Sequence, residues 1–350
     1  MRVIVLYYGD SEGRYASEAL AESFRSFGSQ CTTVDVSAFS SRIGQAIERT
    51  VSFAVSLMNL FRLRRRGASL GAAGLSGSGH LRSFVESAVC DVVITADISS
   101  AFMYMRARRG MLRAPTHYFV SVDHSVDPRI NMLRADRYFI PHSSMKRDFT
   151  EAGVPAERLC AYGIPVTVSS SVRTEMRPRD GALYLLVAEG KKACFRIADA
   201  LLSEMQSQDR LKIFCKDSRR LCSAAAKKYR GDGRVTVELG IGNPISRYGG
   251  VLILASYCPW VTAEMVRNTP IVLYFGVGGI GREYASFFRA SGAAACVFSA
   301  SGAAGRALGL SSSPELRERM YCRQRLAVNQ HASEDIARGI IQSRELLGGA

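Results

Sequence analysis

The sequence lacks the cysteine patterns of metal-binding and redox proteins. Its nine cysteines include no Cys-x-x-Cys pair, and none has a neighbouring His at the spacing of a metal site. We therefore expect free thiols in a reducing cytosol, with no bound metal and no cofactor beyond the substrates.

Long apolar runs are also missing. The longest, Val51 to Phe61, is interrupted by polar residues and is shorter than the ~20 residues that span a bilayer. Met1 to Leu6 leads directly into a turn at Gly9, so we expect neither a transmembrane helix nor a secretion signal. The 350 residues, with 47% hydrophobic and 22% charged side chains, are typical of a folded protein with two domains.

Acidic residues are too few to balance the basic ones. Thirty-one Asp and Glu stand against 46 Lys and Arg, which leaves a formal net charge of +15. This excess favours an anionic partner, either nucleic acid, an acidic lipid surface or a phosphorylated substrate. The sequence has no helix-turn-helix signature and no aromatic-and-basic stacking motif, so we expect no nucleic acid among the partners.

Short apolar runs alternate with segments of helical periodicity. Arg2 to Tyr8 predicts a strand that stops at Gly9, and Ser17 to Phe27 predicts a helix. Similar strands are expected at 91–95, 117–121 and 137–140, and a second series at 183–187, 211–214, 235–237, 251–254 and 270–274. This alternation predicts an α/β fold with two doubly wound, parallel, Rossmann-like sheets.

A polar stretch separates the two series. Residues 168–181 are rich in Ser and charge and contain Pro178, and they show no periodicity. We predict a first domain over 1–170, a linker over 171–181, a second domain over 182–330, and a carboxyl-terminal helix over 331–350 that packs back on the lobes. Ligands of such sheets bind beyond the carboxyl ends of the strands, so we expect the active site in the cleft between the lobes.

Several motifs in the first half keep a recognisable spacing. Asp123, Asp127 and Ile130 are followed by Asp136-Arg137-Tyr138, Ala152-Gly153-Val154 and Gly163-Ile164-Pro165-Val166. This frame resembles the acceptor domain of the monogalactosyldiacylglycerol synthase and processive diacylglycerol glucosyltransferase family. The family has a His and a Trp where this chain has Asp127 and Ile130.

The second half carries the other part of the resemblance. Pro259-Trp260-Val261-Thr262-Ala263-Glu264 is followed by Pro270 to Tyr274, Ala285-Ser286-Phe287-Phe288 and Gly292-Ala293-Ala294. Gly278-Gly279-Ile280-Gly281 falls where the family has Pro-Gly-Gln-Glu. The resemblance implies a GT-B fold, with two facing lobes, and transfer of a sugar from a UDP-sugar to diacylglycerol. The peptidoglycan N-acetylglucosaminyltransferase is related.

The donor site is expected in the second lobe. The loop Glu189-Gly190-Lys191-Lys192 follows a strand and opens a helix, so its amides and lysines are suited to a diphosphate. A solvated basic turn is the alternative. The resemblance implies that Glu264 binds the ribose hydroxyls, unless it is an exposed helix carboxylate. Gly278 and Gly279 permit close backbone approach to the donor, although a surface turn explains them equally.

The base that deprotonates the acceptor is less obvious. In the family, a His in the first loop resembles the general base for the acceptor hydroxyl. This chain has Gly13 and Arg14 at that place, and arginine cannot take up a proton. Glu12 and Asp123 follow first-lobe strands and are the candidate catalytic carboxylates. A helix cap is the alternative for Asp123.

An apolar stripe at helical spacing ends in clustered arginines. Ile43, Ile47, Val51, Val55 and Met58 lead to Arg62, Arg64, Arg65 and Arg66. Such a pattern is typical of a helix in an anionic membrane interface, and equally of a core helix with a basic end. In the family the insertion lies beside the lipid, which favours the membrane.

Together these features predict a glycosyltransferase on the cytoplasmic face of the cell membrane. It would transfer a hexose from a UDP-sugar to a diacylglycerol-type lipid with inversion. The alternative is a catalytically degenerate relative that binds nucleotide or lipid without sugar transfer, because the family's His, Gln and Glu are missing together.

Overall fold

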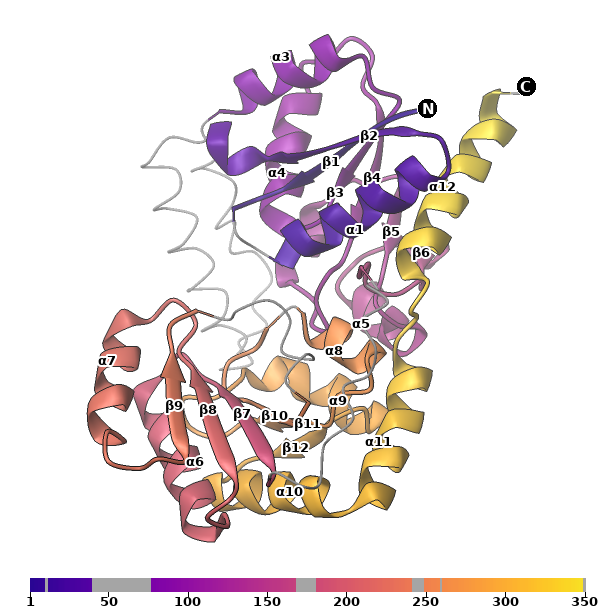
Figure 1. Cartoon of the computed structure of the whole chain (residues 1–350). Helices are drawn as coiled ribbons and strands as arrows, with labels where there is room; N and C mark the ends of the chain where they lie inside the picture. The colour runs from indigo at the N-terminus through magenta and orange to yellow at the C-terminus, as the bar shows by residue number, and fades with distance from the viewer. Residues whose placement is uncertain (10–11, 40–76, 168–180, 241–248, 259, 349–350) are drawn as a thin grey trace. The chain divides into compact units, whose positions relative to one another are not determined.

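The computed structural model describes residues 1–9, 12–39, 77–167, 181–240, 249–258 and 260–348 (Figure 1). The chain divides into two compact units. The first comprises Met1–Thr167 and Asn329–Ala350, and the second comprises Val168–Val328. Most of the predicted linker therefore lies outside the described residues.

The first unit is built on a parallel six-stranded sheet in the order β2-β1-β3-β4-β5-β6. Its strands are β1 (Arg2–Tyr7), β2 (Gln30–Asp35), β3 (Val92–Thr95), β4 (Thr116–Val120), β5 (Arg137–Phe139) and β6 (Leu159–Cys160). Its helices are α1 (Glu12–Ser26), α3 (Ser78–Ala88), α4 (Ile98–Arg108), α5 (Lys146–Glu151) and α12 (Ala332–Gly348).

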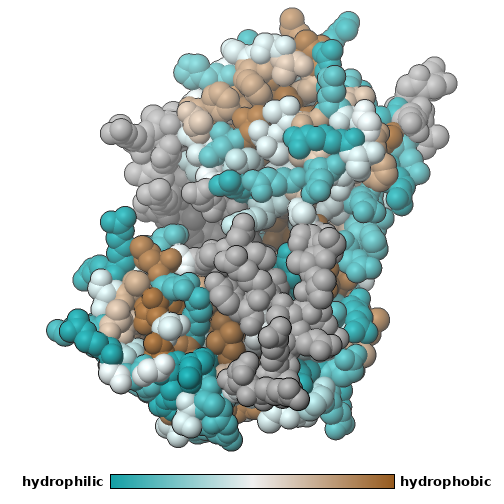
Figure 2. Space-filling view, viewed as in Figure 1, coloured by the Kyte–Doolittle hydropathy of each residue, from teal (hydrophilic) through white to brown (hydrophobic). Residues whose placement is uncertain are grey.

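The last helix belongs to the core of the first unit. Ile336 and Ile340 of α12 are fully buried in the cluster that contains Leu20 and Phe24 of α1. The entry of α12 is also fixed, because Asn329 donates a 2.8 Å hydrogen bond to the carbonyl of Tyr162. Mostly hydrophilic residues cover the outer side of α12 (Figure 2), so the helix buries only one stripe.

The second unit repeats the architecture with a parallel sheet in the order β12-β11-β10-β7-β8-β9. Its strands are β7 (Leu183–Val187), β8 (Arg210–Phe214), β9 (Val235–Glu238), β10 (Val251–Leu254), β11 (Ile271–Tyr274) and β12 (Ala295–Val297). Its helices are α6 (Lys191–Glu204), α7 (Arg219–Lys228), α8 (Val261–Val266), α9 (Ala285–Ser291), α10 (Ala300–Ser312) and α11 (Pro314–Ala327).

Near-continuous apolar strands explain these sheets. β10 and β11 are buried at every position, as expected of parallel strands covered on both faces. Helix α6 presents Ala193, Ile197 and Leu201 to the core at intervals of four residues. The predicted α/β class with two doubly wound parallel sheets is confirmed.

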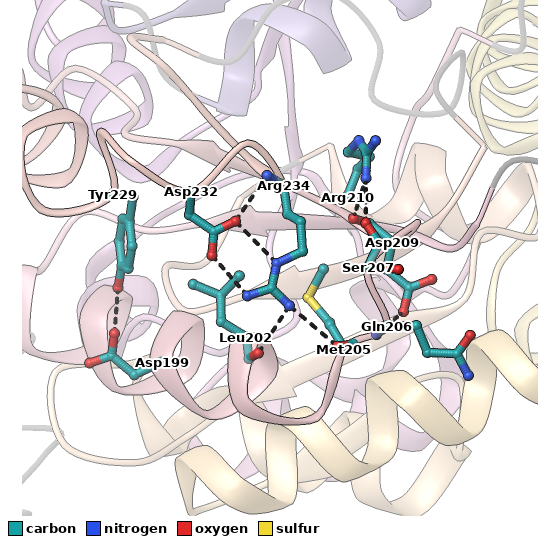
Figure 3. A network of polar contacts seen from close by, with 10 residues as sticks. All are labelled: Asp199, Leu202, Met205, Gln206, Ser207, Asp209, Arg210, Tyr229, Asp232 and Arg234. Carbon is teal, nitrogen blue, oxygen red and sulfur yellow. Dashed lines mark hydrogen bonds and ion pairs between the residues drawn. The ribbon is translucent and has the colours of Figure 1, made fainter.

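Polar contacts fix the carboxyl-terminal end of α6 (Figure 3). The guanidinium of Arg234 pairs with Asp232 and donates hydrogen bonds to the carbonyls of Leu202 and Met205. These carbonyls lie at the end of the helix, where intrahelical donors run out. Asp209 accepts the amides of Ala182 and Gln206 and so ties the start of β7 to the loop before β8.

Candidate functional site

The strand order of the second sheet reverses beside β7. The chain proceeds from β7 to β8 and β9 on one side and then returns to place β10 on the other. Ligands of open α/β sheets bind at such a switch point, beyond the carboxyl ends of the strands. The loops that follow β7, β8 and β10 therefore form the candidate ligand site of the second sheet.

These loops meet in a group of polar residues that we call the Lys216 cluster, which comprises Lys216, Glu189, Ser256 and Tyr257. The ammonium of Lys216 donates to Ser256 Oγ at 3.2 Å and to the Tyr257 carbonyl at 3.3 Å. It also lies 3.5 Å from Glu189 Oε2, which accepts a 3.1 Å hydrogen bond from Ser256 Oγ. The cluster thus joins the ends of three adjacent strands.

The predicted donor loop lies beside this cluster. Gly190 is the N-cap of α6, and Lys191 and Lys192 are exposed in its first turn. A Cβ on Gly190 would lie 3.3 Å from the carbonyl oxygen of Gly278, which follows β11 and has a φ of +77°. The structure therefore brings Gly190 and Gly278 together, and their lack of side chains keeps that approach open.

The rest of the glycine loop is tightly built. A Cβ on Gly279 would lie 2.3 Å from the Tyr274 carbonyl oxygen, so only glycine fits there. The amide of Ile280 bonds to the same carbonyl, and the Ile280 side chain is 4% exposed. Gly279 therefore shapes the loop, and the Ile280 side chain belongs to the core.

Glu264 occupies α8 and is 1% exposed. Thr269 Oγ1 donates a 2.6 Å hydrogen bond to its Oε2, and the Arg267 guanidinium lies 3.6 Å from its Oε1. The alternative of an exposed helix carboxylate is therefore wrong. Its role toward ribose stays a prediction, because the contacts described here hold the carboxylate to Thr269 and Arg267 within the second unit.

An aromatic pair also lies at this edge. The rings of Tyr257 and Tyr284 stack with centroids 3.9 Å apart and planes 19° from parallel. Sequence reasoning missed both tyrosines, and it also missed Lys216 and Ser256. The available signal was position, since Lys216 and Ser256 each lie two residues beyond a correctly predicted strand.

The first sheet has its own switch point, between β1 and β3. The carboxylate of Asp97, just after β3, accepts the amides of Tyr8 and Ser100 at 2.8 Å. Burial raises the pKa of Asp97 to about 6, although these hydrogen bonds oppose the rise. Asp97 therefore anchors the loop after β1 and caps α4.

The two predicted catalytic carboxylates lie on this unit. Asp123 is half-buried three residues beyond β4, and its carbonyl accepts from Ser121 Oγ at 3.5 Å. Asp127, not Asp123, caps the short helix Pro128–Met132. Glu12 is the first residue of α1, and its side chain lies outside the described residues. Both catalytic assignments stay predictions.

The neighbour of Asp123 is neutral. His124 is 2% exposed, and burial lowers its pKa to about 3.

The predicted membrane arginines Arg62, Arg64, Arg65 and Arg66 lie outside the described residues. No helix in the described part of the chain is long and apolar enough to cross a membrane. Across the same part, no three His, Cys, Asp or Glu side chains are grouped to hold a metal ion.

Comparison with known proteins places the resemblance on the first unit. Residues 14–166 match the family described as monogalactosyldiacylglycerol (MGDG) synthase. The motif residues at its carboxyl end have structural roles that suit a shared frame. Gly163 has a φ of +106°, and a Cβ there would lie 2.9 Å from Ala332 Cβ. Among curated proteins, none matches the chain in sequence.

Solved structures match the chain over nearly its whole length. MurG of Acinetobacter baumannii is 12% identical, with a TM-score of 0.60 and coverage of 97% of this chain and 99% of that one. The UDP-GlcNAc 2-epimerase of Neisseria meningitidis, solved with UDP-GlcNAc, is 11% identical, with a TM-score of 0.67 and coverage of 98% and 100%. Anabaena HepE, solved with UDP, is 11% identical, with a TM-score of 0.59 and full coverage of both chains.

At these identities the likeness to solved structures establishes the fold, and the family match adds support for a glycosyltransferase-type enzyme. The chain has the GT-B fold, and its predicted resemblance to the monogalactosyldiacylglycerol synthase family is confirmed over residues 14–166.

Proposed function

We propose that the chain transfers a hexose from a UDP-sugar to a diacylglycerol-type lipid at the cytoplasmic face of a membrane. The observation that carries the proposal is the match of residues 14–166 to the family described as monogalactosyldiacylglycerol (MGDG) synthase, because that name describes the joining of a sugar to diacylglycerol. The net charge of +15 suits an anionic membrane surface as a further partner.

The second unit would bind the donor. The first turn of α6 presents backbone amides at the switch point, and helix amino termini favour anions. Lys191 and Lys192 add two exposed positive charges beside these amides. Solved structures of the same fold with UDP and with UDP-GlcNAc support a UDP-sugar as the donor. This assigns the diphosphate to the loop around Gly190, with Gly278 beside it.

The chemistry would be a single displacement. A carboxylate, Asp123 or Glu12, takes the proton of the acceptor hydroxyl as its oxygen attacks the anomeric carbon. The bond between that carbon and the diphosphate oxygen breaks, UDP leaves with the electron pair, and the anomeric configuration inverts. Positive charge and amides around the diphosphate stabilise the leaving group, so the proposal needs no metal ion.

A second candidate is a protein that binds the nucleotide but transfers no sugar. The specific observation in its favour is the position of Ile280, whose side chain is 4% exposed at the place where the family has a Gln. Ile280 and Gly281 offer no side-chain hydrogen bond to a hexose. Such a protein would keep the phosphate loop and lose turnover.

A product assay separates the two candidates. Purified protein is incubated with diacylglycerol in anionic vesicles and with radiolabelled UDP-glucose, UDP-galactose or UDP-N-acetylglucosamine. The proposal expects label in the lipid phase and an equal amount of released UDP. Asp123→Asn should lower the rate at least 100-fold if Asp123 is the base. Asp148→Asn, an exposed carboxylate on α5 of the same unit, is the matched control and should leave the rate unchanged.

Each other outcome has a distinct reading. UDP-sugar binding without labelled lipid in any arm favours the second candidate. Conversion of UDP-N-acetylglucosamine into an epimer without lipid labelling would contradict the proposed transfer. Full activity in Asp123→Asn would leave transfer standing and move the base to Glu12.

A further inference from the structure

Lys216 has a backbone conformation that lysine rarely adopts. Its φ is +43°, and among the described residues only Val89 and Asn268 share a positive φ without being glycine. This left-handed region is unfavourable for residues with a Cβ, and such residues gather at functional sites. Glycine would serve the backbone better here, so the reason for lysine has to be sought in its side chain.

The Lys216 side chain reaches the switch point of the second sheet. Its ammonium contacts the loops after β7 and β10 through Glu189, Ser256 and Tyr257. Glu189 is the only acidic member of the Lys216 cluster, and its side chain is 65% exposed, whereas that of Lys216 is 26% exposed. Among the described residues, the ammonium therefore contacts two neutral oxygens and the carboxylate of Glu189, which is mostly exposed to water.

Glu189 directly precedes the N-cap of α6. A carboxylate there occupies the neighbourhood of the helix amides that the proposed function assigns to the donor diphosphate. An exposed ion pair at 3.5 Å is weak, because solvent screens it. A diphosphate carries more negative charge than one carboxylate, so it is the stronger partner for the same ammonium.

We infer that Lys216 is a phosphate ligand for a nucleoside diphosphate, and that the Glu189 carboxylate holds its ammonium when no nucleotide is bound. This rests on the proposed function, since it deepens the assignment of the donor site. On binding, a phosphate oxygen replaces Glu189 Oε2 beside the ammonium, and Glu189 swings into solvent. Ser256 and Tyr257 keep Lys216 aimed at the switch point throughout.

The exchange makes opposite predictions for the two members of the ion pair. Lys216→Met removes the charge but keeps the length of the side chain, and it should weaken UDP binding about 10- to 100-fold, the range of a hydrogen bond to a charged group. Glu189→Gln removes the competing carboxylate and should strengthen UDP binding about 2- to 5-fold. A role limited to folding would not make these two changes act in opposite directions.

Calorimetric titration with UDP and with uridine tests the inference on the full-length protein. Uridine lacks phosphate, so its affinity should be the same in the wild type and in Lys216→Met. Lys216→Gly is the second variant, because glycine accepts the backbone at φ +43° without strain, and it should lose UDP affinity like Lys216→Met. Lys212→Met is the matched control, since Lys212 is also ion-paired on β8, 2.7 Å from Glu238, and it should bind UDP like the wild type.

The outcomes distinguish the inference from the proposed function. If the wild type binds UDP and both Lys216 variants bind it equally well, the inference is overturned and the donor site stands. Weaker UDP binding in Glu189→Gln would also overturn the exchange. If the wild type binds no UDP at millimolar concentration, the donor assignment of the proposed function fails, and the inference fails with it.

Discussion

Replacing Glu264 by alanine should destabilise the second unit strongly. The carboxylate is 1% exposed and accepts the Thr269 hydroxyl at 2.6 Å, and that threonine is itself 8% exposed. Its second partner, Arg267, keeps only 14% of its side chain exposed. Glu264→Ala therefore leaves a buried hydroxyl and a largely buried guanidinium without their carboxylate.

The size of the effect follows from these two groups. An unsatisfied buried polar group costs about 1–3 kcal/mol, and loss of one partner of a buried ion pair adds to this. We expect a loss of about 2–4 kcal/mol in the free energy of unfolding, which corresponds to roughly 5–12 °C in Tm for a unit of about 160 residues.

Urea unfolding followed by circular dichroism measures this loss. Glu315→Ala is the matched control, because Glu315 forms an ion pair with Arg319 in which both side chains are more than 70% exposed. That change should cost less than about 1 kcal/mol. Thr269→Val removes the hydroxyl alone, and the double variant with Glu264→Ala should cost less than the sum of the single changes. Wild-type stability in Glu264→Ala would refute the account of this carboxylate.

Three further changes test other parts of the structure. Burial lowers the pKa of His117 to about 3, so below about pH 6.5 the unfolded chain binds a proton that the folded state does not bind. The free energy of unfolding of the wild type should therefore fall by about 1.4 kcal/mol per pH unit between these two values. Urea midpoints that fall equally from pH 7 to 5 in His117→Gln and in the wild type would contradict this. Arg234→Lys loses the fork that binds Asp232 and the end of α6, and should lower the Tm in thermal unfolding. An unchanged Tm would show that the fork is dispensable. Gly163→Ala should destabilise the first unit more than Gly28→Ala, because both have positive φ but only the first would meet a neighbour, Ala332; equal midpoints would argue that strain alone decides.

The regular parts of the fold were predictable because their signals are local. The runs 183–187 and 251–254 are short, apolar and rich in branched residues, and the structure has strands at Leu183–Val187 and Val251–Leu254. The glycine loop could also be placed from sequence, since Gly278 has positive φ and only glycine fits at Gly279.

The Lys216 cluster was not predictable in the same way. Lys216 and Ser256 are 40 residues apart and meet only because β10 returns to the far side of β7. No spacing rule encodes that crossover, and a lysine after a strand does not indicate a positive φ. The burial of Glu264 was not predictable from local spacing either, which is why an exposed carboxylate remained an alternative until the structure placed the Thr269 hydroxyl against it.

The most direct test of the central claim, that this chain takes a UDP-sugar as its donor, is calorimetric titration of the wild type with UDP, UDP-glucose, UDP-galactose and UDP-N-acetylglucosamine. The account predicts a measurable affinity for UDP, with a Kd below about 1 mM, that is, more than about 4 kcal/mol of binding free energy. It predicts little gain from an attached hexose, because the Ile280 side chain is buried and Gly281 has none. Absence of binding for all four compounds at millimolar concentration would contradict the donor assignment.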